Sequence, residues 1–280
     1  MTPQSAKFVR SGKVKDIYEL DSGHLVFHFT DRVSAFDVIL PSMIPRKGEV
    51  LCRLGAYWFE TLGVKNHMTG LEGKDRMVVK KLQMIPIESV VRGYLYGSLY
   101  ERVRAGEVRL RDATELAAEL PEPYFDPTTK SDIKDVPITE SEILEQKRMT
   151  KAELEEVRES SISIYRNLAG AAKRAGFIMA DVKLEFGRDE EGRVVLADSI
   201  GPDEFRLWPA ESYKVSRMQE SYDKQVIRDW LNEVGYKKSL DDARKNGSPL
   251  PDPPTLPAVL VSEAGRRYVE AYERLTDRKF

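Results

Sequence analysis

The stretch FIMADVKLEF at residues 177–186 alternates apolar and charged side chains, which is the period-two pattern of a β-strand with two unlike faces. The apolar face consists of Ile178, Ala180, Val182 and Leu184. The charged face consists of Asp181, Lys183 and Glu185. Residues 188–193 predict a turn, and the run at 194–198 predicts a returning strand that ends on Asp198. The sequence therefore predicts an antiparallel hairpin that gathers charged groups on one face.

The length of the turn decides which residue lies opposite Asp198. A two-residue turn at 191–192 places Glu185 there, whereas a four-residue loop at 189–192 places Lys183 there. In both registers Asp198 shares the charged face, because side chains alternate along a strand, but a three-residue loop would break this. Facing carboxylates repel unless a cation lies between them, and oxygen ligands without His or Cys favour Mg²⁺. The alternative is a solvent-facing strand with an internal salt bridge.

Further elements lie on both sides of this hairpin. The early part predicts a hairpin, a helix and two strands, at 7–30, 48–62, 77–79 and 82–91, and Pro86 is expected to interrupt the last strand. The later part predicts four helices, at 97–105, 141–175 with a break near 149–150, 222–234 and 262–275. It also predicts a long loop at 121–139. This distribution predicts an α+β fold. We expect a smaller β-rich N-terminal domain at 1–88 and a larger α+β domain at 89–280, with 85–88 as the hinge.

The composition limits the class of protein. The chain has 280 residues, with 44 Lys plus Arg against 46 Asp plus Glu, and 41% hydrophobic residues. That apolar content is enough for a core, which excludes a disordered polyelectrolyte, and the net charge of −2 argues against a nucleic-acid binder held by bulk positive charge. No run of about 20 apolar residues predicts a membrane span, and no signal peptide is predicted. The single cysteine, Cys52, fits a reducing compartment, so we expect a cytoplasmic protein.

Charges that cancel in the total are separated along the chain. Acidic residues recur later, at Asp181, Glu185, Asp198 and Asp203. Basic residues cluster early, at Lys7, Arg10, Lys13, Lys15, Arg46, Lys47, Lys80 and Lys81. Such a separation suits a polyphosphate and its metal, because cations meet phosphate oxygens and carboxylates meet a hard cation. The alternative is a solvated surface of mixed sign. The sequence contains no P-loop, GxGxxG, HExxH or GxSxG motif, so those nucleotide-binding, zinc and hydrolase classes have no support.

Several segments together resemble the SAICAR synthetase family of purine-biosynthesis ligases. They are GKVKDIY at 12–18, DRVSAFD at 31–37, IPRKG at 44–48, PIESVVRGY at 86–94 with GS at 97–98, EPYFDPTTK at 122–130, DVKLEFG at 181–187, PD at 202–203 with RLW at 206–208, and SYDKQ at 221–225 with RDWL at 228–231. The resemblance covers nearly the whole chain, and eight segments in order are specific where one would not be. The long region 92–130 and the Pro-rich tail are more similar to the fungal-type branch.

The resemblance implies a two-domain α+β fold with antiparallel sheets and an ATP cleft between the small and large domains. It implies a reaction in which ATP, the carboxylate of carboxyaminoimidazole ribotide and L-aspartate give an amide, ADP and phosphate. Phosphorylation turns the carboxylate into an acyl phosphate, which the aspartate amine attacks. It also implies that Mg²⁺ accompanies ATP and that the partners are small molecules rather than nucleic acid or membrane. The alternatives are another ATP-using ligase or kinase, or a catalytically silent or altered nucleotide-binding relative.

Roles for particular residues follow from the same resemblance. The ATP site would contain phosphate-binding Lys13 and Lys15, which we expect on one face of the first strand, adenine-side Lys80, Leu82, Met84 and Glu88, and the magnesium ligands Glu185 and Asp198. The ribotide site would contain Arg92, Ser98 and Arg206, with Ser34 and Asp37 on a loop that closes over it. The catalytic residues would be Lys183 near the reacting carboxylate, Asp181, and Asp135 in the long loop.

The chain departs from the family pattern at two places. The family has an acidic pair where this chain has Asp198 and Ser199, so one metal-site contact is in doubt. Residues 131–135 lack the His that many relatives carry there, so we expect the loop to contact its substrate differently.

Overall fold

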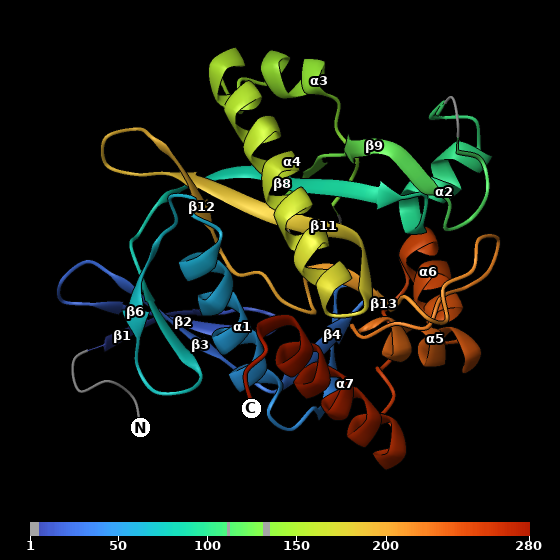
Figure 1. The fold of residues 1–280 in the computed structure, drawn as a ribbon. Helices are drawn as coiled ribbons and strands as arrows, with labels where there is room; N and C mark the ends of the chain where they lie inside the picture. The colour runs from blue at the N-terminus through green and yellow to red at the C-terminus, as the bar shows by residue number, and fades with distance from the viewer. Residues whose placement is uncertain (1–5, 111–112, 131–134) are drawn as a thin grey trace.

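The computed structural model describes residues 6–110, 113–130 and 135–280. An N-terminal antiparallel sheet has the strand order β1-β2-β3-β7-β6. Its strands are β1 (Ala6–Ser11), β2 (Lys15–Leu20), β3 (Leu25–Phe29), β6 (Met68–Leu71) and β7 (Arg76–Val79). Helix α1 (Lys47–Thr61) packs against this sheet and buries one apolar face (Figure 1). The early hairpin, the helix and the strand at 77–79 are where the sequence predicted them.

The second sheet is built around the alternating stretch at 177–186, which forms part of β11 (Phe177–Arg188). Strand β11 pairs with β8 (Gln83–Tyr94), β12 (Val194–Ala197) and β13 (Phe205–Pro209). Strands β9 (Glu119–Phe125) and β10 (Thr128–Thr129) add to β8. Because β11 has partners along its whole length, residues on one face of it can meet groups from three other strands.

A long helix covers the second sheet. Helix α4 (Lys151–Arg174) crosses β8 and β11 in Figure 1, and its Tyr165 hydroxyl donates to the Met179 carbonyl at 2.8 Å. A Cβ atom at Gly93 would lie 1.7 Å from that hydroxyl oxygen, so only glycine allows this approach. The helix α3 (Glu140–Glu145) precedes it. The predicted interruption near 149–150 is present, and Thr150 caps α4.

Four more helices and a small hairpin complete the description of the fold. Helix α2 (Gly97–Arg104) follows β8, and α5 (Gln225–Glu233), α6 (Tyr236–Asn246) and α7 (Ala258–Thr276) follow β13. Helix α7 lies beside α1 (Figure 1). Strands β4 (Arg32–Ala35) and β5 (Val38–Met43) form a separate two-stranded sheet. Helix α6 was not predicted from the sequence, and only Tyr236 and Leu240 are buried in it.

One hydrophobic cluster joins the two larger sheets. It includes Phe27 and Met77 of the first sheet, Leu54 of α1, and Val91 and Leu184 of the second sheet. Residues 85–88, the predicted hinge, lie within β8. The division into domains at residue 88 remains a prediction.

Three local expectations are wrong. The stretch 121–139 contains β9 and β10 rather than only a loop. Strand β8 continues through Pro86, which lies at an irregularity between the pairs Glu185–Glu88 and Gly187–Met84, so its missing N–H breaks no regular ladder. The 31–37 segment is part of the β4–β5 hairpin rather than an open loop, with Phe36 and Asp37 in the left-handed conformation at its turn.

Both expected registers of the β11–β12 hairpin are also wrong. Glu185 pairs with Ala197 and Arg188 with Val194, so the connection is 189–193. The Asp189 carboxylate accepts hydrogen bonds from the backbone N–H groups of Arg193 at 2.8 Å and Glu191 at 3.1 Å, which stabilises this longer turn. Asp198 therefore lies beyond the paired part of β12, with a left-handed φ of 62°.

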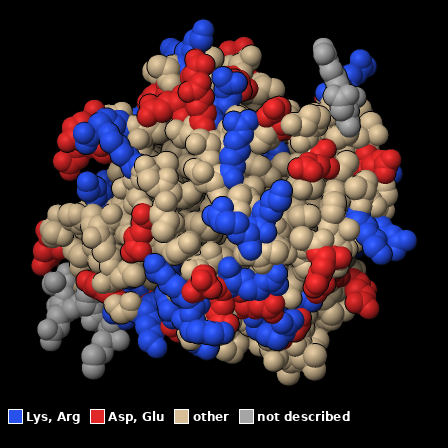
Figure 2. Space-filling model, in the orientation of Figure 1, with Lys and Arg blue, Asp and Glu red and all other residues tan. Residues whose placement is uncertain are grey.

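The surface carries both signs of charge. On the face shown in Figure 2, acidic and basic side chains are interspersed rather than divided into two halves. Across the described part of the chain, no helix has the length and apolar character to span a membrane.

Candidate active site

The pairing of β11 with its neighbours builds a buried group of charges, the arginine cluster, made of Arg92, Asp126, Asp181 and Arg206. Asp181 lies opposite Arg92 of β8 on one side and opposite Arg206 of β13 on the other. Its Oδ2 accepts from Arg92 Nη1 at 3.4 Å and also from Arg206 Nη1. Arg92 Nε donates to Asp126 Oδ2 at 2.5 Å, and Arg92 Nη2 donates to Ser98 Oγ at 2.9 Å. All three donor positions of Arg92 are thus fixed.

Arg206 is held tightly against the start of α2. A Cβ atom at Gly97 would lie 2.9 Å from Arg206 Nη2, and the φ of Gly97 is 59°, so glycine is required there on both counts. The Arg206 guanidinium also lies 5.7 Å from the centre of the Tyr96 ring. Its Nε is buried and has no hydrogen-bond partner within the described residues. The predicted ribotide residues Arg92, Ser98 and Arg206 therefore do come together.

A second group, the lysine cluster, consists of Lys15, Lys130, Lys183, Glu88, Glu185 and Asp198. Lys183 Nζ donates to Glu88 Oε1 at 2.9 Å and to Glu185 Oε1 at 3.1 Å. Lys130 pairs with the other oxygen of Glu185, and Lys15 of β2 pairs with Asp198. Strand β11 thus supplies Asp181 to one cluster and Lys183 and Glu185 to the other.

The charges of the lysine cluster shift its protonation equilibria. Burial tends to raise the pKa of Glu185, but Lys183 and Lys130 outweigh it and hold that pKa at about 2. Burial lowers the pKa of Lys15 to about 8, against the attraction of nearby carboxylates. Burial also opposes the charge of Lys183, yet Glu185 and Glu88 raise the pKa of that ammonium group. At neutral pH Glu185 is therefore an anion, as a magnesium ligand must be.

A buried ion pair lies beside the lysine cluster. Lys47 at the start of α1 is fully buried, and its Nζ donates to Asp203 Oδ2 at 2.7 Å. Tyr268 of α7 donates its hydroxyl to Asp203 Oδ1 at 2.6 Å. Burial would raise the pKa of Asp203, but Lys47 and the other nearby donors lower it well below its usual range. The loop that carries Asp203 is thereby fixed to both helices.

The other predicted residues are more scattered. Lys13 precedes β2, is half exposed and pairs with Asp37 at 2.5 Å, so the expectation that it shares a strand face with Lys15 is wrong. Lys80 and Leu82 lie in the connection between β7 and β8, and Met84 lies at the start of β8, 38% exposed. Ser34 is buried in β4. Asp135 is half-buried, and its neighbour Val136 bonds through its N–H to Thr129 Oγ1 at 3.2 Å, next to Lys130.

Several residues that complete these clusters were given no role from the sequence. Lys130 and Asp126 lie within the 122–130 family segment, where their charge in an otherwise apolar and small-residue stretch was the available signal. The sequence placed Lys47 and Asp203 only in the separated basic and acidic sets, without a specific role, and both lie in segments that resemble the family. Glu204 follows Asp203, and nothing in the pattern distinguished it from a surface acid.

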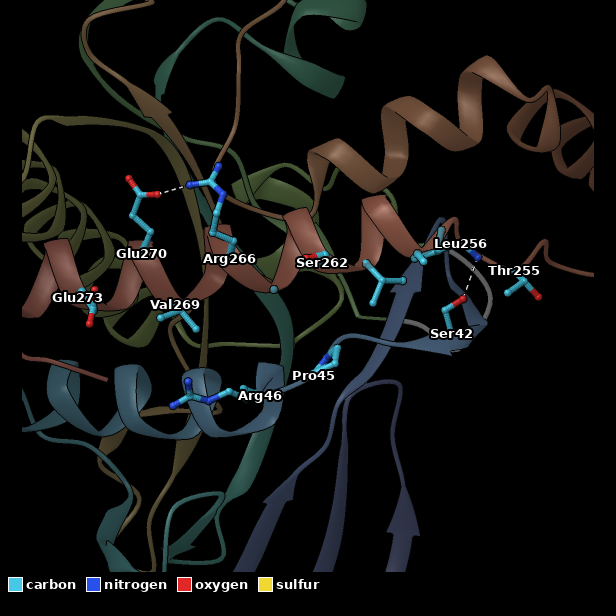
Figure 3. Close-up of a pocket in the computed structure, with 13 residues that line it drawn as sticks. Ser42, Pro45, Arg46, Thr255, Leu256, Ser262, Arg266, Val269, Glu270 and Glu273 are labelled. Atoms are coloured by element: carbon cyan, nitrogen blue, oxygen red, sulfur yellow. Dashed lines mark hydrogen bonds and ion pairs between the residues drawn. The ribbon is translucent and has the colours of Figure 1, made fainter.

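A large cavity of about 1000 Å³ lies elsewhere, between α7 and the β5–α1 junction. Figure 3 shows Ser42, Pro45 and Arg46 on one side of it and the α7 residues on the other. The Arg266–Glu270 ion pair on its rim, 2.6 Å long, lies within α7. None of the predicted site residues lines this cavity.

Comparisons with known proteins agree with the geometry. A profile of the SAICAR synthetase family matches residues 8–243. The phosphoribosylaminoimidazole-succinocarboxamide synthase of Nitrosopumilus maritimus (strain SCM1) is 49% identical over 272 residues, covering 96% of this chain and 98% of the relative. The synthase of the same name from Corynebacterium glutamicum (strain R) is 40% identical, covering 98% and 95%.

Solved structures are similar over the whole length. The SAICAR synthase of Saccharomyces cerevisiae, complexed with SAICAR, has a TM-score of 0.84 and 34% identity and covers 100% of this chain and 98% of its own. A type-2 SAICAR synthetase in complex with ADP has a TM-score of 0.75 and 29% identity, covering 97% and 99%. The α+β fold with antiparallel sheets, as predicted, is thus shared with solved SAICAR synthases.

The chain belongs to the SAICAR synthetase family. The relatives at 49% and 40% identity are archaeal and bacterial, and both exceed the 34% identity of the yeast protein. Sequence identity therefore does not assign the chain to the fungal-type branch.

Proposed function

We propose that the protein joins L-aspartate to the carboxylate of carboxyaminoimidazole ribotide, with ATP converted to ADP and phosphate, as a step of purine biosynthesis. The observation that carries this proposal is that β11 presents two unlike clusters on one strand, with Asp181 between guanidinium groups and Lys183 with Glu185 among ammonium groups. One relative in the comparison binds SAICAR and another binds ADP, which supports one site for each kind of ligand.

The arginine cluster is the proposed site of the ribotide phosphate. Guanidinium groups bind phosphate oxygens through two parallel N–H donors, and Ser98 adds a hydroxyl. The free Nε of Arg206 is one donor still available for a ligand, since no described residue accepts from it. Ser34 and Asp37, on the β4–β5 hairpin, are proposed to border the same substrate, and Asp181 to orient the ribotide through its hold on both arginines.

The lysine cluster is the proposed site of the ATP phosphates. Lys15 and Lys183 would exchange their carboxylate partners for phosphate oxygens, with Lys13 at the more exposed edge. Lys80, Leu82, Met84 and Glu88 are proposed to lie on the adenine side, along the connection from β7 to β8. The nucleotide would then lie between the first sheet, which supplies Lys15, and β11.

Glu185 and Asp198 fit a magnesium ion by their chemistry. Both are carboxylates, and Mg²⁺ usually takes one or two protein carboxylates and completes its shell with phosphate oxygens and water. Among the described residues no group of three or more His, Cys, Asp or Glu side chains gathers that could hold a metal ion. When bound, the ion would neutralise charge on the phosphates. Ser199 adds no carboxylate, so these two carry the role.

The proposed chemistry proceeds through an acyl phosphate. A carboxylate is a poor electrophile, and phosphorylation gives it a leaving group. Lys183, with the donors around it, would stabilise negative charge as phosphate transfers, and the protein would mainly position the reactants. Asp135 is proposed to contact the imidazole or the amino acid. The proposed substrates are small molecules, and the protein is proposed to act on them in the cytoplasm.

Product measurement tests the proposal. Purified protein should release ADP in step with SAICAR only when ATP, ribotide and aspartate are all present. ADP release that does not depend on either substrate would indicate another ATP-using enzyme. Nucleotide binding without turnover under any combination would indicate a silent relative.

A further inference from the structure

Glu204 lies beside the lysine cluster but has no place in the roles assigned so far. Its backbone carbonyl accepts a hydrogen bond from the Lys183 N–H at 2.7 Å, and its own N–H donates to the Gly201 carbonyl at 2.9 Å. These two bonds fix the turn before β13 against the middle of β11. Glu204 is therefore held next to the strand that supplies Lys183 and Glu185.

One of the two side-chain oxygens of Glu204 is unusual for a buried carboxylate. Its Oε2 is buried and has no hydrogen-bond partner among the residues that the structure describes. That oxygen lies close to the backbone of the turn, since a Cβ atom at Gly201 would be 3.4 Å from it. Buried carboxylate oxygens are nearly always bonded to a donor, so an unpaired one at a site calls for a donor that arrives with a ligand.

Charged groups from several neighbouring elements influence Glu204. Lys15 of β2, Lys183 of β11 and Lys224 before α5 favour its ionised form. Asp203 opposes it, and Asp203 is itself held by Lys47 of α1 and Tyr268 of α7. Burial is the largest influence, and with Asp203 it raises the pKa of Glu204 to about 7. The carboxyl group can therefore both hold and release a proton near neutral pH.

The substrates offer few groups that suit such an acceptor. The ATP phosphates, the ribotide phosphate and all the carboxylates are anions that a carboxylate repels. The ammonium group of L-aspartate carries three N–H donors and a positive charge, so it is complementary to Glu204. It must also lose a proton before it can attack a carbonyl carbon.

We propose that Glu204 binds the amino group of L-aspartate and accepts its proton when the amide forms. This inference rests on the proposed function. One N–H proton passes from the ammonium group to the Glu204 carboxylate, and the freed lone pair forms the new C–N bond at the acyl phosphate carbon. The C–O bond to phosphate breaks, and phosphate leaves with the electron pair and takes up the second N–H proton. Glu204 then returns its proton to water.

Hydroxylamine separates this step from the earlier ones. It attacks acyl phosphates to give hydroxamates and is mostly unprotonated at neutral pH, so it needs neither an ammonium site nor a proton acceptor. The experiment measures ADP release from wild-type protein and from Glu204→Gln with ATP, Mg²⁺ and ribotide, using either aspartate or hydroxylamine as the nucleophile. Glu211→Gln, an exposed acid after β13, is the matched control.

We expect Glu204→Gln to lower the aspartate-dependent rate about 100-fold, because a positioned general base contributes a rate enhancement of about that size. The hydroxylamine-dependent rate should stay within about threefold of the wild-type rate. The ratio of the two rates does not depend on the folded fraction, so partial misfolding cannot imitate this result. If Glu204→Gln gave no folded protein, the same ratio would be measured in Glu204→Asp, with a fall of about tenfold expected from the shorter side chain. An unchanged ratio in the folded variant would overturn the proposal.

The pH profile gives a second readout. In wild-type protein the aspartate-dependent rate relative to the hydroxylamine rate should fall as the pH drops below about 7 and Glu204 becomes protonated. Glu204→Gln should lose this acid limb, and an identical limb in the variant would contradict a proton-accepting role. Wild-type protein that releases no ADP with either nucleophile would refute the proposed function itself, which is a different result from an unchanged ratio.

Discussion

The arginine cluster and the lysine cluster share a strand but are built differently. The Arg92 side chain is only 5% exposed and bonds to a strand residue, a helix residue and Asp126 just after β9. The Lys130 side chain is 39% exposed, and its ion pair holds Glu185. A guanidinium is a fixed planar fork, whereas an ammonium is a mobile point charge. If the proposed roles are right, the ribotide end is formed in advance, and we expect the ion pairs of the ATP end to exchange when phosphate binds.

The largest expected effect comes from replacing Asp198, the proposed metal ligand in the lysine cluster. Asp198→Asn should lower the Mg²⁺-dependent rate about 100-fold or more, because Mg²⁺ binds an anionic oxygen far better than an amide. Asn tolerates the left-handed backbone of Asp198, where alanine would add strain of about 1 kcal/mol, so the fold should be preserved. Initial rates over a range of Mg²⁺ concentrations measure the effect.

Asp277→Asn is the matched control, because Asp277 is also left-handed, with φ at 54°, but is exposed at the end of α7. Its rates should equal those of the wild-type protein. An Asp198→Asn variant with an unchanged Mg²⁺ dependence would remove Asp198 from the metal site.

The next effect tests whether the arginine cluster depends on its planar fork. Arg92→Lys keeps the charge but cannot reach Asp126, Asp181 and Ser98 together, so the KM for ribotide should rise about 100-fold, or about 3 kcal/mol. The KM for ATP should stay within about threefold, since the other cluster is intact. Steady-state kinetics with each substrate varied in turn measure both values. Equal increases in the two KM values would show that the clusters do not act separately.

A smaller effect compares two lysines that the sequence treated alike. Lys15→Met should raise the KM for ATP about tenfold, because Lys15 is largely buried at 13% exposure and faces the cluster. Lys13→Met should change it less than about threefold, because Lys13 is 49% exposed and its ion pair is weak in water. Similar KM values in the two variants would contradict the distinction.

The last effect is on stability rather than on rate and concerns His67, which contacts the backbone of Asp198 beside the lysine cluster. Its Nε2 lies 3.1 Å from the Asp198 carbonyl oxygen, and burial, aided by Lys15, lowers its pKa to about 3. The unfolded chain would bind the proton near pH 6.5, so the folded protein loses stability as the pH falls below that value. Between pH 7 and pH 5 this group alone should remove about 2 kcal/mol of unfolding free energy.

Urea unfolding at the two pH values measures the loss, with His67→Asn as the comparison. The variant should lose about 2 kcal/mol less than the wild-type protein over the same interval. An equal loss in both proteins would show that His67 is not buried as a neutral ring.

The sequence predicts the parts of the fold that follow a simple period. The alternation at 177–186 and the helical spacing at 48–62 became β11 and α1 with little error in their ends. Strand β9 was missed because Pro121 and Pro123 argue against a strand, yet β9 pairs on one side only, with β8, where a missing N–H is tolerated.

The sequence yields a set of candidate site residues, which remain predictions, but not the geometry that joins them. The register at Asp198 depends on the Asp189 side chain, which caps a five-residue connection that no pattern in the sequence specifies. Lys13 and Lys15 were indistinguishable by spacing, because their difference comes from where β2 begins. Glu204 gave no signal at all, since its environment is made by residues distant in the sequence.

The buried contact among Lys47, Asp203 and Tyr268 has a consequence for how the chain folds. Lys47 and Asp203 are 156 residues apart, and Tyr268 follows Asp203 by another 65. During synthesis, Lys47 of α1 therefore cannot be buried until Asp203 has emerged, because a buried lone charge is strongly unfavourable. The turn that carries Asp203 and Glu204 can settle only after α7 arrives. We expect nascent chains that lack α7 to remain open to proteases at this turn, whatever ligands are present.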